Sequence, residues 1–183
     1  SCTLESLAGR VEVSRGVALE LLTRLEERGL ASHGAGGFVL TEVGRAYALR
    51  ILRTHRLWER YLADRTGVPA AEWHAEAERV EHRMSAEEAD RLAARLGYPR
   101  YDPRGDPIPT SVGDIPAPVG MPLTAAEPGQ RVVVLHVEDE PAAVYDRLTA
   151  AGVAPGLLLE VVAPDSDGAR REGRPLRVRA RGR

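Results

Sequence analysis

Histidine and carboxylate side chains recur at helical spacing between residues 55 and 82, which read HRLWERYLADRTGVPAAEWHAEAERVEH. Residues three or four apart share one face of a helix, so two imidazole–carboxylate sets can meet where two such helices pack. Neutral imidazole with carboxylate, and without a thiolate, suits harder first-row ions such as Mn²⁺ or Fe²⁺. The spacing therefore predicts a divalent metal site and leaves the role of the metal open. The pairs that carry this prediction are His55 with Glu59, His74 with Glu78, and Glu78 with Glu81 and His82.

Two other interpretations of these residues stay open. Helices rich in Glu and Arg are usually solvated faces with salt bridges, and a single histidine is usually structural. A metalloenzyme is the second alternative, because carboxylate and imidazole around a divalent ion can activate water. Against it, the sequence has no HExxH phrase and no separate nucleophile or acid–base set. We therefore do not expect an enzyme.

The composition restricts the class of protein. A chain of 183 residues with 43% hydrophobic residues can hold one large domain or two to three small ones. Its net charge of −2 argues against constitutive binding to polyanions, and every basic residue is Arg. The single cysteine, Cys2, excludes an intrachain disulfide and fits a reducing compartment. No apolar run approaches the roughly 18 residues of a membrane span. We expect a cytoplasmic protein with no membrane segment and no organic cofactor.

The first 50 residues have the pattern of a winged helix-turn-helix. Residues 3–9 predict a short amphipathic helix, and Ser14 is a natural N-cap for a second helix that ends near Arg28 before Gly29. Two short strands with a Gly-rich tip follow in residues 30–41. Helices joined by a tight turn and followed by a hairpin predict binding to double-stranded DNA.

Candidate DNA contacts lie at the start of the second helix and beside the hairpin. Ser14, Arg15 and Gly16 are placed for phosphate or base-edge contact, and Glu20 could accept from a cytosine amino group. Arg45 is a candidate phosphate contact. Through residue 54, seven Arg against six Glu give +1, so attraction to phosphate from this segment alone is expected to be weak.

The remaining chain divides into helical and strand-rich parts. Periodic apolar residues predict one long helix over 43–63, a second over 70–83 and a third over 85–96. The apolar stripe of the third helix could pack internally or against a second subunit. A Pro-rich and Gly-rich stretch leads to short strand patterns and one small helix, which predict a small barrel with a helical insert. We expect four regions: 1–50, 51–112, a linker at 113–124, and 125–183.

The phrases THRLWERYL, HAEAERVEHRMS and DPRGDPIP, in this order and after a winged helix, closely resemble the diphtheria toxin repressor family of metal-dependent transcriptional regulators. The resemblance implies a mainly α fold with some β structure. It also implies a DNA-binding winged helix-turn-helix, a helical metal-binding and dimerisation domain, and a C-terminal SH3-like β-barrel. A homodimer that binds a DNA operator is the expected assembly.

The resemblance also assigns ligands residue by residue. His55, Glu59 and His74 match the family's ancillary metal site, and Glu78, Glu81 and His82 match its primary, activating site. The iron-responsive branch has Cys where this chain has Glu78, so a hard carboxylate there favours Mn²⁺, with Fe²⁺ as the alternative and other divalent ions able to substitute. Glu138 and Glu140 are weaker candidates for the ancillary site, and His136 is expected to be structural.

Two departures from the family pattern affect the expectations. The family has a helix ahead of the helix-turn-helix that donates a further primary-site ligand, and no such helix precedes residue 3, so we expect an incomplete primary site. Arg104 occupies the third position of the family's DPHG phrase, where no ligand role is expected. The implied function is repression of metal-uptake genes when metal is bound. A winged-helix regulator that no longer senses metal remains the main alternative.

Overall fold

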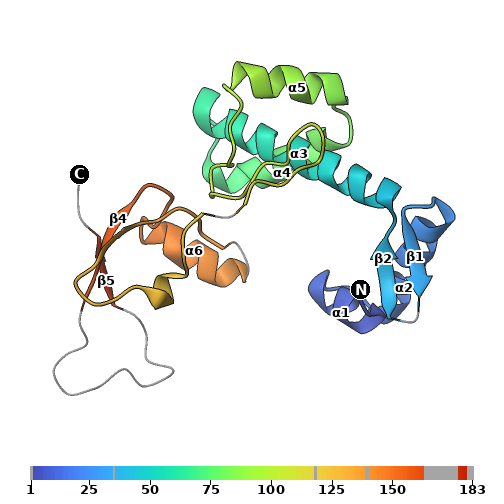
Figure 1. The fold of residues 1–183 in the computed structure, drawn as a ribbon, viewed down its shortest axis with the longest axis horizontal. Helices are drawn as coiled ribbons and strands as arrows, with labels where there is room; N and C mark the ends of the chain where they lie inside the picture. The colour runs from blue at the N-terminus through green and yellow to red at the C-terminus, as the bar shows by residue number, and fades with distance from the viewer. Residues whose placement is uncertain (1, 35, 118, 139–140, 163–176, 181–183) are drawn as a thin grey trace.

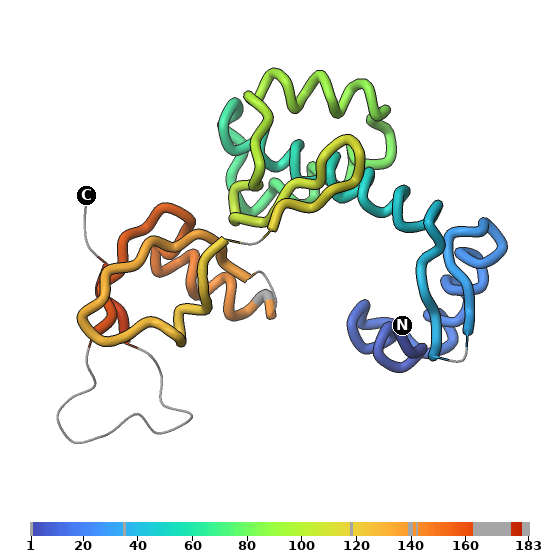
Figure 2. Tube along the Cα trace, viewed as in Figure 1, coloured from blue at the N-terminus to red at the C-terminus, as the bar shows by residue number. Residues whose placement is uncertain are grey.

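The computed structural model describes residues 2–34, 36–117, 119–138, 141–162 and 177–180, and Figures 1 and 2 show their arrangement. The fold mixes helices with two small sheets. Glu140 and the whole of the segment 163–176 lie outside the described residues. The elements are α1 (Leu4–Arg10), α2 (Arg15–Glu27), β1 (Ala31–Gly34), β2 (Gly37–Leu40), α3 (Glu42–Arg65), η1 (Ala70–Glu72), α4 (Trp73–Glu81), α5 (Ala86–Arg95), η2 (Leu123–Ala125), β3 (Arg131–Val133), α6 (Ala142–Ala150), β4 (Leu158–Val161) and β5 (Val178–Ala180).

The N-terminal segment has the order of elements that the sequence predicts. Ser14 begins α2 by accepting a hydrogen bond from the Val17 amide (3.3 Å), as an N-cap residue does. After α2, Gly29 adopts a positive φ of 68°, which reverses the chain into the hairpin. Strands β1 and β2 pair antiparallel with Ala31 opposite Leu40. Two helices followed by a hairpin therefore stand at the N-terminal end of α3.

Helix α3 connects this segment to the residues that could hold metal. It is a single helix of 24 residues, capped by the Thr41 hydroxyl, which accepts from the Gly44 amide. In Figure 1 it runs without a break from β2 to the group formed with α4 and α5. The hairpin and the histidines are thus carried on one continuous element.

The helical core forms between α3, α5 and the loop after α5. Its buried members are Leu57, Ala89, Leu92, Ala93 and Ile108. A capping box between Ser85 and Glu88 begins α5, as the sequence indicates. Because Ala89, Leu92 and Ala93 are buried within this chain, the apolar stripe of α5 packs internally.

The predicted second helix is divided in two. Residues 70–72 form the short turn η1, and α4 extends from Trp73 to Glu81, so the helix ends earlier than the predicted residue 83. Trp73 fixes the start of α4 by donating its indole N–H to the Val68 carbonyl (2.9 Å). His82 consequently stands at the C-cap rather than inside a helix.

The C-terminal part contains an antiparallel sheet in the order β3-β4-β5 together with α6. It contacts the loop at residues 102–106: the Val137 amide donates to the Arg104 carbonyl (3.0 Å). A Cβ added to Gly105, whose φ is 95°, would lie 1.9 Å from the Leu135 carbonyl oxygen. The close approach therefore requires glycine. Among the described residues, every helix is too short or too polar to cross a bilayer.

Candidate metal centre

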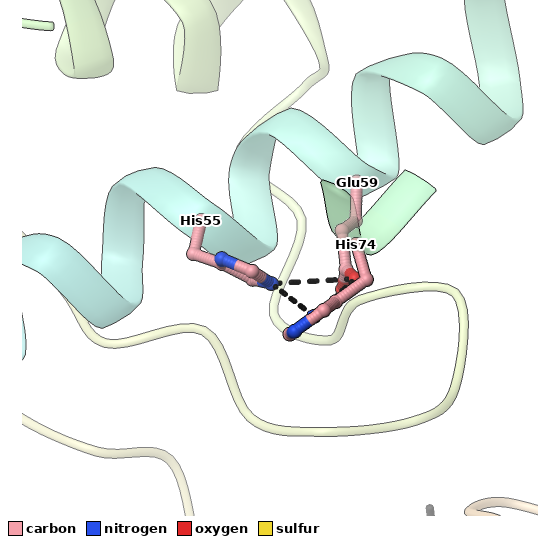
Figure 3. A group of neighbouring side chains, drawn as sticks. All are labelled: His55, Glu59 and His74. Carbon is pink, nitrogen blue, oxygen red and sulfur yellow. Dashed lines mark hydrogen bonds and ion pairs between the residues drawn. The ribbon is translucent and has the colours of Figure 1, made fainter. Parts of the chain in front are cut away.

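Helices α3 and α4 bring together one compact group of potential metal ligands. His55 and Glu59 come from successive turns of α3, and His74 comes from the first turn of α4 (Figure 3). One ligand atom from each lies within 4.8 Å of the others. The His55 and His74 rings approach to 3.1 Å between Nε2 and Nδ1. We call these three residues the inner set.

Glu59 is the most unusual member of the inner set, because it is a carboxylate that is only 2% exposed. Its Oε1 lies 3.3 Å from His55 Nε2, 3.8 Å from His74 Nδ1 and 3.1 Å from Arg104 Nη2. None of these three nitrogen atoms donates a hydrogen bond to Oε1. A buried oxygen without a directed donor is costly unless a cation satisfies it. The inner set therefore fits a divalent cation with mixed nitrogen and oxygen ligands.

The inner set is also electrostatically coupled. Burial lowers the pKa of His55, but the carboxylates of Glu59 and Glu81 outweigh this, and the net pKa lies above its ordinary value. Burial raises the pKa of Glu59, while His55 and Arg104 outweigh it and hold that pKa below its ordinary value. His55 and Glu59 thus favour their charged forms when no metal is bound.

Glu81 connects the inner set to the other predicted ligands. Its Oε2 lies 2.6 Å from His55 Nδ1, and its Oε1 lies 3.2 Å from His82 Nε2. Glu78 lies 3.4 Å from His74. The side chains of Glu78 and His82 are more than 60% exposed, so they stand at the rim while Glu59 and His55 stand inside.

All six predicted ligands line one hollow of about 650 Å³. Toward the hairpin, the same hollow is lined by apolar side chains of α2, β2 and α3. The structure therefore places the two predicted sets in one continuous site. It brings the inner set within coordination reach and leaves Glu78 and His82 farther out.

Arg104 also lines the site, although no local sequence signal indicates that it should. Two residues hold its loop. The Arg56 guanidinium donates a hydrogen bond to the Pro107 carbonyl (2.5 Å), and the Asp102 carboxylate accepts hydrogen bonds from the backbone amides of Arg104 and Asp106. This brings the guanidinium of Arg104 to Glu59. No ligand role was expected for Arg104; the geometry instead places its guanidinium against a predicted ligand, Glu59.

Of the two weaker candidates, Glu138 lies beside the contact between the C-terminal part and this loop. Glu138 is exposed and follows Val137, which binds the Arg104 carbonyl, while Glu140 lies outside the described residues. His136, expected to be structural, has its Nε2 at 3.5 Å from Asp106 Oδ1. The structure thus brings this segment near the site without placing Glu138 among the ligands.

The candidate DNA contacts lie in the N-terminal segment. Arg15 pairs with Glu5 (3.0 Å), and Glu20 pairs with Arg24 (2.6 Å), in each case between exposed side chains. Gly16 and Arg45 are exposed in the first turns of α2 and α3. The Ser14 hydroxyl caps α2. Exposed ion pairs of this kind contribute little to stability, so Arg15 and Glu20 can exchange them for other partners.

Two helices and a hairpin joined to a histidine–carboxylate cluster around a buried glutamate indicate a metal-responsive regulator, and comparison with known proteins supports this class. The family described as "Iron dependent repressor, metal binding and dimerisation domain" matches residues 41–110, and the FeoA domain matches residues 121–170. The iron-dependent repressor IdeR of Mycobacterium tuberculosis is 36% identical over 169 residues, covering 85% of this chain and 73% of the relative. The diphtheria toxin repressor of Corynebacterium glutamicum is 31% identical over 175 residues, with the same coverage of each.

Solved structures agree with these matches. A manganese-dependent transcriptional repressor in complex with manganese has a TM-score of 0.74 and 32% identity, covering 98% of this chain and 85% of that one. The IdeR of T. acidophilum has a TM-score of 0.69 and 25% identity, covering all of this chain and 82% of that one. The chain belongs to the diphtheria toxin repressor family of metal-dependent transcriptional repressors. The two relatives named above are repressors, and the similar proteins include both iron-dependent and manganese-dependent members.

Proposed function

We propose that this protein is a transcriptional repressor that binds its DNA operator as a homodimer when Mn²⁺ occupies the site between α3 and α4, and that it controls metal-uptake genes. Fe²⁺ is the alternative metal. The observation that carries the proposal is the buried, undonated Oε1 of Glu59 between two imidazoles, which is the arrangement a divalent cation would complete.

The ligand chemistry supports manganese. His55, Glu59 and His74 would form one ligand set, and Glu78, Glu81 and His82 the other, joined through Glu81. Both sets contain only imidazole and carboxylate, and hard oxygen ligands suit Mn²⁺ better than a thiolate would. Glu138 and Glu140 remain weaker candidates, since they follow the segment that contacts the 102–106 loop.

The N-terminal segment would be the DNA-reading part, as a winged helix-turn-helix over residues 1–50. Helix α2 would enter the major groove, with Ser14, Arg15, Gly16 and Glu20 near its leading end. Arg45 would contact phosphate beside the hairpin. Because the segment carries almost no net charge, its affinity would depend on the correct spacing of two copies rather than on general attraction to phosphate.

The helical region 51–112 would hold metal and form the dimer, and residues 125–183 would form an SH3-like barrel after the linker at 113–124. A bound divalent cation would neutralise the carboxylates and join α4 to α3. Because α3 is one continuous helix from Glu42 to the ligands, fixing α4 against α3 would also fix the position of the hairpin relative to the metal site. Linkage then requires that DNA and metal tighten each other's binding equally.

A DNA-binding measurement tests this function. Duplexes would be selected from a randomised pool with Mn²⁺ present, and their affinity measured by fluorescence anisotropy with Mn²⁺ or with a chelator. The matched control is Glu76→Gln, which removes a carboxylate from α4 at an exposed pair with Arg79. We expect chelation to weaken binding about tenfold or more for the wild type and the control, within the usual range of allosteric coupling.

Glu81→Gln is expected to lose that response to Mn²⁺, because it breaks the connection between the two ligand sets. Equal affinity with and without Mn²⁺ would instead support a winged-helix regulator that does not sense metal. No selected DNA at all would reject the repressor.

A further inference from the structure

Arg104 lies where the ligand cluster and the C-terminal part of the chain meet. Its guanidinium reaches Glu59 Oε1 at 3.1 Å, and its side chain is only 14% exposed. Its Cζ lies 5.5 Å from the centre of the Tyr145 ring on α6, at cation–π distance. Its backbone carbonyl accepts from Val137. One residue thus contacts the inner set with its side chain and the C-terminal part with side chain and backbone.

The guanidinium is a fixed positive charge, because Arg does not lose its proton in proteins. It lies against the same oxygen that the inner set would offer to a metal, and it helps hold the pKa of Glu59 low. A divalent cation bound to the inner set would be repelled by a like charge at this distance. Arg104 therefore neutralises part of the charge of Glu59 and opposes the binding of a cation there.

We propose that Arg104 is the affinity-determining residue of the inner set: its guanidinium holds Glu59 and must leave it before a divalent cation binds there. Tyr145 stabilises the guanidinium in the holding position. Metal at the inner set and the Arg104–Tyr145 contact therefore compete, and by linkage each weakens the other by the same factor. This inference rests on the proposed function only in requiring that the inner set binds a divalent cation.

The test is a Mn²⁺ titration of the full chain without DNA, in which electron paramagnetic resonance measures free Mn²⁺. The phase that belongs to the inner set is the one that His74→Gln removes. We expect Arg104→Gln to tighten this phase about tenfold, the order expected for removing a like charge a few ångströms away after screening. Arg104→Lys keeps the charge but loses the planar stacking on Tyr145, so it is expected to tighten the phase by no more than about threefold, well short of Arg104→Gln.

Two further variants separate charge from packing. Arg60→Gln removes the same charge from α3, where Arg60 pairs with Asp64 and not with Glu59, and it should leave the titration unchanged. Tyr145→Leu keeps Arg104 but removes the aromatic ring on which its guanidinium stacks. We expect this variant to bind Mn²⁺ at the inner set about threefold more tightly. Thermal melting in chelator confirms that each variant is folded.

The outcomes are distinct. If Arg104→Gln titrates like Arg60→Gln, or binds Mn²⁺ more weakly than the wild type, the inference is wrong while the proposed function stands. If Arg104→Lys tightens binding as much as Arg104→Gln, packing rather than charge sets the affinity, which also overturns it. If the wild type binds no Mn²⁺, both the inference and the proposed function are rejected.

Discussion

Two buried carboxylates, Glu59 and Asp102, lie at or beside the candidate metal site. Two imidazoles and a guanidinium hold the pKa of Glu59 below its ordinary value and so keep it ionised. Its buried Oε1 nevertheless accepts no hydrogen bond. Asp102 shows the opposite case. Burial raises its pKa to about 6, although the backbone amides of Asp106 and Arg104 bind it. Burial thus raises the pKa of both acidic side chains, but the net shifts differ in sign: His55, Arg104 and His74 outweigh burial at Glu59, whereas the nearby carboxylates of Asp106 and Glu59 add to it at Asp102.

Asp102 gives a prediction for stability against pH. Its ordinary pKa is 3.8 and its folded pKa is about 6, so the folded state binds the proton more tightly than the unfolded state between these values. The contribution of Asp102 to the free energy of unfolding should therefore rise as pH falls from about 6 toward 4, by up to roughly 3 kcal/mol. Asp102→Asn keeps an oxygen acceptor for both amides and should lack this rise.

Urea unfolding of the two proteins in chelator, at pH 4.5 and pH 7.5, measures the effect. The free energy of unfolding of the wild type, relative to that of Asp102→Asn, should be larger at pH 4.5 than at pH 7.5. A difference between the two proteins that does not change with pH would contradict the assignment of this proton to Asp102.

At the scale of elements, α3 depends on close contact with the start of the hairpin. A Cβ added to Gly44 would lie 1.8 Å from the Leu30 carbonyl oxygen, which is backbone and cannot rotate away. Gly44→Ala should therefore push α3 from the hairpin and destabilise the protein by about 2–4 kcal/mol, as overpacking against a rigid neighbour does. Gly9→Ala in α1, where the added Cβ meets open space, should be neutral or stabilising by up to about 1 kcal/mol.

Thermal unfolding followed by circular dichroism compares the two. Equal melting temperatures for Gly44→Ala and Gly9→Ala would show that α3 does not depend on this contact. A loss of Mn²⁺-dependent DNA binding in Gly44→Ala, with Mn²⁺ binding retained, is expected as well, because the link between hairpin and ligands is disturbed.

The elements that could be predicted from sequence are those fixed by local signals. Ser14, Ser85 and the helical spacing around His55 act within one or two turns, so they indicated the helices and the histidine–carboxylate pairs. The boundary of α4 was missed because it depends on the Trp73 indole reaching back to Val68. Arg104 was missed because its meeting with Glu59 spans 45 positions of the sequence and depends on the loop held by Arg56 and Asp102.

At the scale of the whole molecule, the C-terminal part is positioned by its approach to the 102–106 loop. Gly105→Ala would place a Cβ against the Leu135 carbonyl and should separate the two parts. Gly97→Ala is the matched control, since it has a similar positive φ and no neighbour within 4 Å. Small-angle scattering should show a larger radius of gyration for Gly105→Ala only. Equal radii for both variants would mean that this contact does not hold the parts together.

The central claim is that side chains of α3 and α4 together bind a divalent cation. The most direct measurement is electron spin echo modulation of the Mn²⁺-loaded protein, which detects nitrogen bound directly to the ion. We predict modulation from imidazole nitrogen in the wild type that is weakened when His55 of α3 is replaced by Gln, and lost when His55, His74 and His82 are all replaced. Mn²⁺ that binds without any nitrogen modulation, or modulation that survives the triple substitution, would contradict the claim.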